Sequence, residues 1–332
     1  MQQNNKNPNL IRRNLILNKL AKYNLIKNRQ TKQIAKPIIN NNSNLIKPIK
    51  PIKPINNKEV KPKKIAFICG SNYKNTKFPL NGCLNDCKNI STELIKNGFN
   101  VTLLTDETQF KPNKTNIISI LISLISTLNS GDIFMFHFSG HGTQTAAGKT
   151  FREKDGLDEL ICTIEDNNTI SFIFDNEFNS ILQNGLKNKN NISMLFLFDC
   201  CHSCSMLDLK YTYNSINKKF DIEDANVDNR QTINSNNRIV CFTGCADKQE
   251  SLDVGLFKNN EVVYGGLFTI NFLQALQSVK NGNISTYTQL IDLVILLVNK
   301  NNNKPQLASN IDLLNITIPN YNIIPKGFFS NN

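Results

Sequence analysis

Two short motifs place a histidine and a cysteine where they could share chemistry. The first motif is SGHG at residues 139–142, and the second is DCCHS at residues 199–203. Each one ends an apolar run that is typical of a buried strand. Ligands of open parallel sheets lie beyond the carboxyl ends of the strands, so we expect His141 and Cys201 at neighbouring strand ends. A histidine beside a cysteine raises the thiolate fraction, and the thiolate is the nucleophilic form.

Backbone donors at the same place complete a site for acyl transfer. Gly142 would let its N–H approach a developing oxyanion, with the N–H of Cys201 as the second donor. A zinc cluster formed by His202 with Cys200, Cys201 and Cys204 is the competing interpretation. The sequence has no second pair of ligands at zinc-like spacing, so it favours the nucleophile.

The pattern of apolar residues from residue 64 onward predicts alternating strands and helices, and therefore an α/β domain with a mostly parallel sheet covered on both faces. Between the elements, the polar, Asn-rich segment 210–237 is predicted to be a flexible linker. The expected strands are 65–70, 101–105, 132–140, 192–198, 238–244 and 305–310, and the expected helices are 83–97, 113–128, 175–184, 266–279 and 286–299.

The charge of the chain is concentrated at its start. The whole chain carries a formal charge of +12, but residues 1–64 hold 16 Lys or Arg against one acid, which leaves the remainder slightly negative. Residues 1–63 are therefore predicted to be a flexible basic leader, rich in Asn, Lys and Pro. Within it, residues 10–29 could form a basic amphipathic helix for an anionic membrane or a nucleic acid; the alternative is a solvated tail.

Cysteine usage and hydropathy indicate the compartment. The nine cysteines are an odd number and six of them lie in or beside apolar runs, which suits a reducing compartment, so we expect a cytoplasmic protein. The longest apolar stretches, 117–128 and 290–298, fall short of the roughly 20 residues that a membrane span needs. A monomer is the expected state.

The order of several motifs resembles that of the type I metacaspases, a branch of the caspase-like peptidases. SGHG and DCCHS are joined in family order by LNGCLNDCKN, DGLDE, SMLDL, FTGCADKQESLD and KPQLASN, so the resemblance covers about residues 64–312. It implies a caspase-like three-layer sandwich with a mostly parallel central sheet. The implied parts are a p20-like region at 64–209, the linker, a p10-like region of the same domain at 238–320 and a tail at 321–332.

The resemblance assigns roles within a cysteine endopeptidase. His141 corresponds to the general acid-base, and Cys201, not Cys200, corresponds to the nucleophile in the family's Asp-x-Cys-His-Ser pattern. The primary specificity pocket corresponds to Cys83, Asp86, Ser139 and Asp199. Two carboxylates there imply protein or peptide substrates with Arg or Lys at the cleavage point, whereas caspases that prefer Asp would need basic residues.

The resemblance also implies calcium activation and self-processing of a zymogen. The implied Ca²⁺ ligands are Asp158, Asp175, Asn176 and Asp208, which are all oxygen ligands, as a hard cation requires. Asn176 stands where the family usually has Asp, so we expect weaker calcium binding. Self-cleavage points are expected at basic residues of the linker and after Lys149, Arg152 or Lys154.

One further departure from the family pattern and two competing functions stay open. Cys204 stands where Gly or Ala is usual, and an oxidisable residue beside the nucleophile could permit redox control. The first competing function is a catalytically silent scaffold or protein-quality-control factor, because a fold does not guarantee activity. The second is a membrane or nucleic-acid binder that acts through the basic leader.

Overall fold

The computed structural model separates residues 1–59 from a second unit, whose described residues begin at residue 61. Almost all of the predicted leader, together with the tail from 317 onward, lies outside the described residues. Among the helices that are described, none has the length and apolar character to cross a membrane. The described residues are 61–146, 157–201, 205–222, 233, 236–244, 253–258, 261–298, 304–314 and 316.

An eight-stranded sheet forms the centre of this unit, in the order β2-β1-β3-β7-β10-β13-β8-β9. The first five strands in this order run parallel, and the last three continue the sheet with antiparallel pairing. The bounds are β1 Lys64–Gly70, β2 Asn100–Thr105, β3 Ile133–Ser139, β7 Ser193–Asp199, β8 Tyr211–Asn214, β9 Lys219–Ile222, β10 Arg238–Thr243 and β13 Gln306–Ser309.

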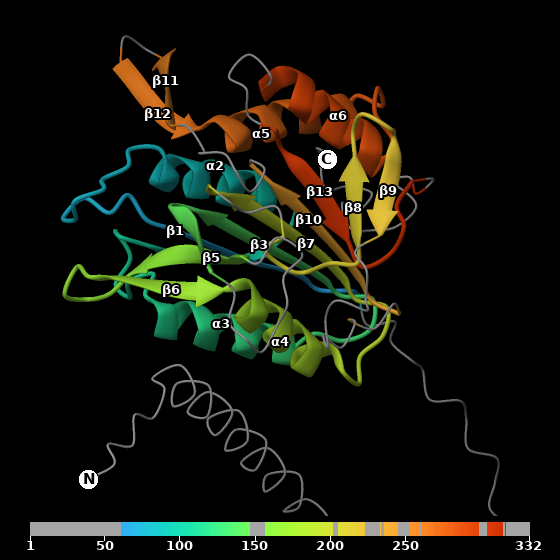
Figure 1. The fold of residues 1–332 in the computed structure, drawn as a ribbon, viewed down its shortest axis with the longest axis horizontal. Helices are drawn as coiled ribbons and strands as arrows, with labels where there is room; N and C mark the ends of the chain where they lie inside the picture. Colours follow the sequence, from blue (N-terminus) through green and yellow to red (C-terminus); the bar gives the residue numbers. More distant parts are fainter. Residues whose placement is uncertain are drawn as a thin grey trace, which may run out of the picture. The chain divides into compact units, whose positions relative to one another are not determined.

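Helices cover both faces of this sheet (Figure 1). The helices α2 (Cys83–Lys96), α5 (Leu267–Lys280) and α6 (Tyr287–Val298) lie on one face, and α3 (Lys114–Ser126) and α4 (Asp175–Leu186) lie on the other. Each face has its own apolar core. The predicted three-layer α/β arrangement is therefore confirmed, and the five predicted helices begin and end within about two residues of their expected bounds.

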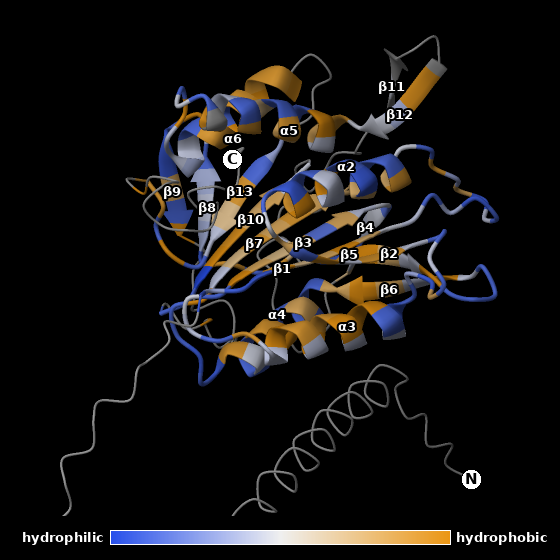
Figure 2. Ribbon diagram, turned by 180° about the vertical axis from the view of Figure 1, so that it is seen from behind, coloured by the Kyte–Doolittle hydropathy of each residue, from blue (hydrophilic) through white to orange (hydrophobic). Residues whose placement is uncertain are grey.

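The central strands are apolar because both of their faces are buried, as Figure 2 shows by their colour. Alternate side chains of β3 and β7 face opposite layers. Phe136 packs against Phe196 and Phe198 with ring centroids 5.7 and 5.6 Å apart, in the apolar core that also holds residues of α3 and α4. The alternation puts Ser139 and Asp199 on the opposite side, under α2 and α5.

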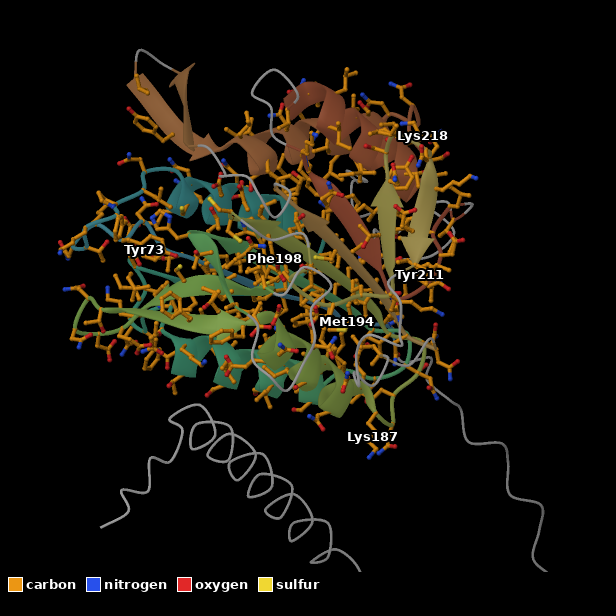
Figure 3. All side chains as sticks on the ribbon, in the orientation of Figure 1. Tyr73, Lys187, Met194, Phe198, Tyr211 and Lys218 are labelled. Carbon is orange, nitrogen blue, oxygen red and sulfur yellow. The ribbon has the colours of Figure 1, made fainter. Side chains whose placement is uncertain are left out.

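Three parts of the structure were not expected. A separate antiparallel sheet, β4-β5-β6, follows β3, and a two-stranded hairpin, β11-β12, precedes α5. The linker prediction for 210–237 is wrong at residues 211–222, which form the hairpin β8-β9 at the sheet edge; Figure 3 labels Tyr211 and Lys218 in it. The bounds of the other strands are β4 Gly142–Ala146, β5 Leu157–Ile164, β6 Ile170–Phe174, β11 Asp253–Lys258 and β12 Glu261–Gly266.

Candidate active site

Strand register sets the histidine and the cysteine at the same level. β3 and β7 are parallel neighbours whose last aligned residues are Ser139 and Asp199. His141 and Cys201 each stand two residues beyond that pair. The two backbone segments stay in contact beyond the strand ends. A Cβ placed on Gly142 would lie only 2.1 Å from the carbonyl oxygen of Cys201, so the two backbones are closely packed there. The structure thus brings the two predicted segments side by side.

The His141 ring is held on two sides. Its Nε2 lies 2.8 Å from the carbonyl oxygen of Phe78, and its centroid lies 4.7 Å from that of the Tyr73 ring. A carbonyl oxygen can only accept, so we assign the imidazole proton to Nε2. Nδ1 is then the nitrogen with a lone pair, and it is the atom available to take a proton.

Solvent exposure separates Cys201 from the other described cysteines. Among the described cysteines, Cys201 alone is not buried, whereas its neighbour Cys200 is fully buried in the core. Burial, and then the proximity of Cys201, raises the pKa of the Cys162 thiol to about 12. Burial also raises the pKa of Cys69 and Cys241. These buried thiols stay protonated and inert near neutral pH.

Two buried carboxylates lie at the beginning of α5. Asp86, on α2, is fully buried; it accepts a hydrogen bond from Ser139 Oγ at 2.8 Å and bonds from the Gly266 N–H at 2.9 and 3.0 Å. Asp199 accepts from the Thr269 N–H at 2.9 Å. These amides lie at the N-terminus of α5, so both carboxyl groups face the positive end of the helix dipole.

Gly266 brings the two carboxylates together. A Cβ at this position would lie 2.1 Å from Asp199 Oδ2 and 2.8 Å from Asp86 Oδ2, so both oxygens touch the same backbone. Cys83, the fourth residue predicted here, is buried at the beginning of α2. We call Asp86 and Asp199 the carboxylate pair. Sequence reasoning missed Gly266 and Thr269, although two glycines directly before an apolar helix were a usable signal of close packing.

The four predicted calcium ligands also gather. Asp175 is fully buried, and burial, followed by the charge of Asp208, raises its pKa. Asp175 Oδ2 accepts a bond from the Glu159 N–H at 2.9 Å, and Asn176 Nδ2 donates to Asp158 Oδ1 at 3.5 Å. Oxygen donors and mutually repelling carboxylates suit a hard cation. In the described part of the chain, however, no three His, Cys, Asp or Glu side chains already form a ligand set.

Several residues named from the sequence lie outside the described residues. They include His202 and Cys204, which belong to the zinc interpretation and the redox interpretation. The segment 147–156, which holds three expected self-cleavage points, also lies outside. Tyr73 and Phe78, in contrast, are described and were missed, because nothing in their spacing relates them to a histidine more than 60 residues away.

Comparisons with known proteins agree on one family. Residues 63–210 match the family model described as metacaspase, peptidase C14 domain. Metacaspase-5 of Trypanosoma brucei brucei is 31% identical over 227 residues, covering 64% of this chain and 44% of the relative. Metacaspase-1A of Aspergillus oryzae is 40% identical over 157 residues, covering 45% and 36%. Metacaspase-1 of Plasmodium falciparum is 30% identical over 256 residues, covering 73% and 39%.

One solved structure shares the fold of this chain. The crystal structure of protein GSU0716 from Geobacter sulfurreducens superposes with a TM-score of 0.52 at 23% identity, covering 75% of this chain and 93% of that one. The chain spans less than half of the length of each metacaspase named above. Residues 63–210 match the family model directly, and the relatives extend the match beyond them. The chain therefore belongs to the metacaspase family.

Proposed function

We propose that this protein is a cysteine endopeptidase that cleaves after Arg or Lys, with Cys201 as nucleophile and His141 as acid-base. One observation carries the proposal. The loops that follow β3 and β7 leave the sheet in register and in backbone contact, and the only unburied cysteine of the described chain stands on one of them, level with a histidine on the other. A nucleophile and its base must share such a position.

The reaction begins with proton transfer from the Cys201 thiol to Nδ1 of His141. The thiolate attacks the scissile carbonyl carbon, and the negative charge moves to the carbonyl oxygen, which accepts bonds from the N–H groups of Gly142 and Cys201. The imidazolium then gives its proton to the leaving amine as the C–N bond breaks. A water molecule hydrolyses the resulting thioester, with His141 as base, and restores the thiol.

The carboxylate pair explains the choice of substrate. A guanidinium or ammonium group beside Asp86 and Asp199 replaces repulsion between two buried anions with attraction, and Arg can contact a carboxylate through two N–H groups. An acidic side chain would add a third negative charge to the same place. Substrates with Asp before the scissile bond are therefore rejected.

Calcium activation rests on the four predicted calcium ligands. Asp158, Asp175, Asn176 and Asp208 would hold Ca²⁺, and the ion would supply positive charge that offsets the repulsion between Asp175 and Asp208. Asn176 contributes a neutral oxygen, so binding is weaker than with a carboxylate there. Self-processing belongs to the same proposal, at basic residues of the segment 147–156.

Hydrolysis of short fluorogenic peptides tests the proposal. Peptides that end in Arg, Lys or Asp are compared with and without calcium, for the wild type, Cys201→Ala, His141→Ala and the matched control Cys200→Ala. We expect release from the Arg and Lys peptides, loss of activity in the first two variants, and activity in the control. Full activity of Cys201→Ala would remove the mechanism, and preference for the Asp peptide would remove the assigned specificity.

A further inference from the structure

A buried tyrosine, Tyr73, links the backbone of the loop after β3 to the backbone of β5. The Tyr73 hydroxyl accepts a hydrogen bond from the His141 N–H at 3.0 Å and donates one to the Cys162 carbonyl at 2.7 Å. The Cys162 N–H donates in turn to the His141 carbonyl at 2.9 Å. One hydroxyl therefore ties the loop after β3 to β5 and uses both its donor and its acceptor capacity.

The same chain segment also holds the imidazole. Tyr73 presents its ring to His141 at a centroid distance of 4.7 Å and an interplanar angle of 39°, while the Phe78 carbonyl binds Nε2. The segment is anchored at its start, where the Ser71 N–H donates to the Ser139 carbonyl at 3.2 Å and the Asn72 N–H donates to Asp106 at 2.7 Å. Residues 73–78 therefore contact His141 at its backbone N–H, at its ring face and at Nε2.

Three features show that this arrangement is specific. Tyr73 is fully buried and has a φ of 51°, in the left-handed region that non-glycine residues seldom adopt. A Cβ on Gly140 would lie 2.5 Å from the Tyr73 hydroxyl oxygen, so only glycine leaves room for it. Burial, and then the neighbouring Cys162, raises the pKa of the Tyr73 phenol, which keeps the hydroxyl protonated and able to donate.

We propose that Tyr73 is a positioning residue that orients His141 so that Nδ1 faces Cys201. The proposal rests on the proposed function, since it assigns Tyr73 a role in the Cys201–His141 pair. Phenylalanine at this position would keep the ring contact but leave the His141 N–H and the Cys162 carbonyl without their partner. The backbone of His141 would then shift to find other partners, and displacements of about 1 Å at a reacting group can cost roughly 100-fold in rate.

The test compares Tyr73→Phe with the matched control Tyr213→Phe. Tyr213 is also a buried tyrosine whose hydroxyl binds a protein oxygen, Asp292 Oδ2 at 3.3 Å, but it lies on β8. Three quantities are measured: kcat and KM for an Arg peptide, the pH midpoint of Cys201 alkylation by iodoacetamide, and the unfolding temperature.

For Tyr73→Phe we expect kcat to fall roughly 10- to 100-fold with little change in KM. The alkylation midpoint should rise towards the ordinary thiol value of about 8.5, because a misplaced imidazole stabilises the thiolate less. Tyr213→Phe should keep both the wild-type kcat and the wild-type midpoint. A wild-type alkylation midpoint in Tyr73→Phe would overturn the proposal, even if its unfolding temperature or its kcat were lower.

His141→Ala separates this proposal from the proposed function. Unchanged alkylation and hydrolysis in His141→Ala would mean that the pair itself is wrong. Loss of both in His141→Ala together with wild-type behaviour of Tyr73→Phe would refute only the role of Tyr73. If Tyr73→Phe does not fold, Ser71→Ala takes its place, because Ser71 Oγ accepts from the Tyr73 N–H at 3.1 Å. A smaller rise of the same midpoint is expected there, and no rise contradicts the proposal.

Discussion

Replacing Gly266 with alanine is expected to displace the carboxylate pair without straining the backbone. Gly266 has φ −66° and ψ 131°, which alanine adopts freely. The added methyl would, however, lie 2.1 Å from Asp199 Oδ2 and 2.8 Å from Asp86 Oδ2. Because such atoms pack at about 3.5 Å or more, at least one carboxylate has to move by about 1 Å.

Two costs set the magnitude of this effect. Overpacking a buried site lowers the free energy of unfolding by about 1–3 kcal/mol. A carboxylate that moves also weakens its bond from the Gly266 or Thr269 N–H, and a hydrogen bond to a charged group contributes about 1.5–3 kcal/mol. If the cationic substrate loses a similar interaction in the transition state, kcat/KM for Arg peptides falls by about 10- to 100-fold, since 1.36 kcal/mol corresponds to about tenfold.

The assay measures kcat/KM for Arg peptides together with thermal unfolding, and Gly98→Ala is the control. Gly98 has a φ of 78° with nothing within 4 Å of its Cβ position, so alanine there costs about 1 kcal/mol of backbone strain and touches no site residue. We expect the control to unfold earlier but to hydrolyse the peptide normally. Normal hydrolysis by Gly266→Ala would show that the pair does not lie under this glycine in the active enzyme.

Three further predictions concern pH, calcium and self-processing. Burial lowers the pKa of His137 to about 3, so the folded state keeps its full stability above about pH 6.5 and loses about 3 kcal/mol of it as the pH falls to about 4.5. The free energy of unfolding in urea should show this loss in the wild type but not in His137→Leu. An equal loss in both proteins would contradict the prediction. Burial and Asp208 raise the pKa of Asp175, so its folded form favours the proton, and stability is lost as pH rises above about 4. In chelator at pH 7, Asp175→Asn should therefore unfold at a higher temperature than the wild type, and calcium should raise only the wild-type value; calcium stabilisation of both would exclude this ligand. Sequenced self-digestion fragments should show cuts within 147–156 and none after Lys218, which lies in the β8-β9 turn with an ion pair to Asp292 at 2.8 Å, and an early cut there would refute this.

The central elements could be predicted because each carries its own local signal. The run predicted to be a strand at 192–198 is β7 at Ser193–Asp199, and its residues 194–198 are continuously apolar since both faces are buried. The helix predicted at 113–128 is α3, whose buried residues Ile117, Leu121 and Ile125 recur every four positions. In both cases the pattern of buried residues is visible within one short stretch of the sequence.

The missed strands depend on distant partners instead. β4, GTQTA, is polar and partly exposed, and its pairing with β5 joins residues on either side of the segment 147–156. β8 pairs with β13, where Thr212 lies opposite Ala308 almost 100 residues later. Strands of four residues with mixed polarity resemble loops until their partner is known, which is why the linker prediction failed at 211–222.

The candidate site also contains residues with a local signal and residues that depend on distant contacts. His141 and Cys201 could be named because motifs at strand ends are local features, and the parallel register then aligns them. The groups that contact His141 and Asp86 could not be named from the sequence. Tyr73 reaches His141 across 68 positions, and Gly266 reaches Asp86 across 180, through backbone atoms that carry no residue-specific signal.

Covalent labelling tests the central claim most directly. A peptidyl chloromethyl ketone that ends in Arg should place its group near the nucleophile and form a single thioether, which digestion and mass spectrometry locate among nine cysteines. We predict one adduct per chain, on Cys201, absent from the His141→Ala protein and not formed by the analogous Asp reagent. An adduct on Cys200 or another cysteine, or equal labelling by the Asp reagent, would contradict the account.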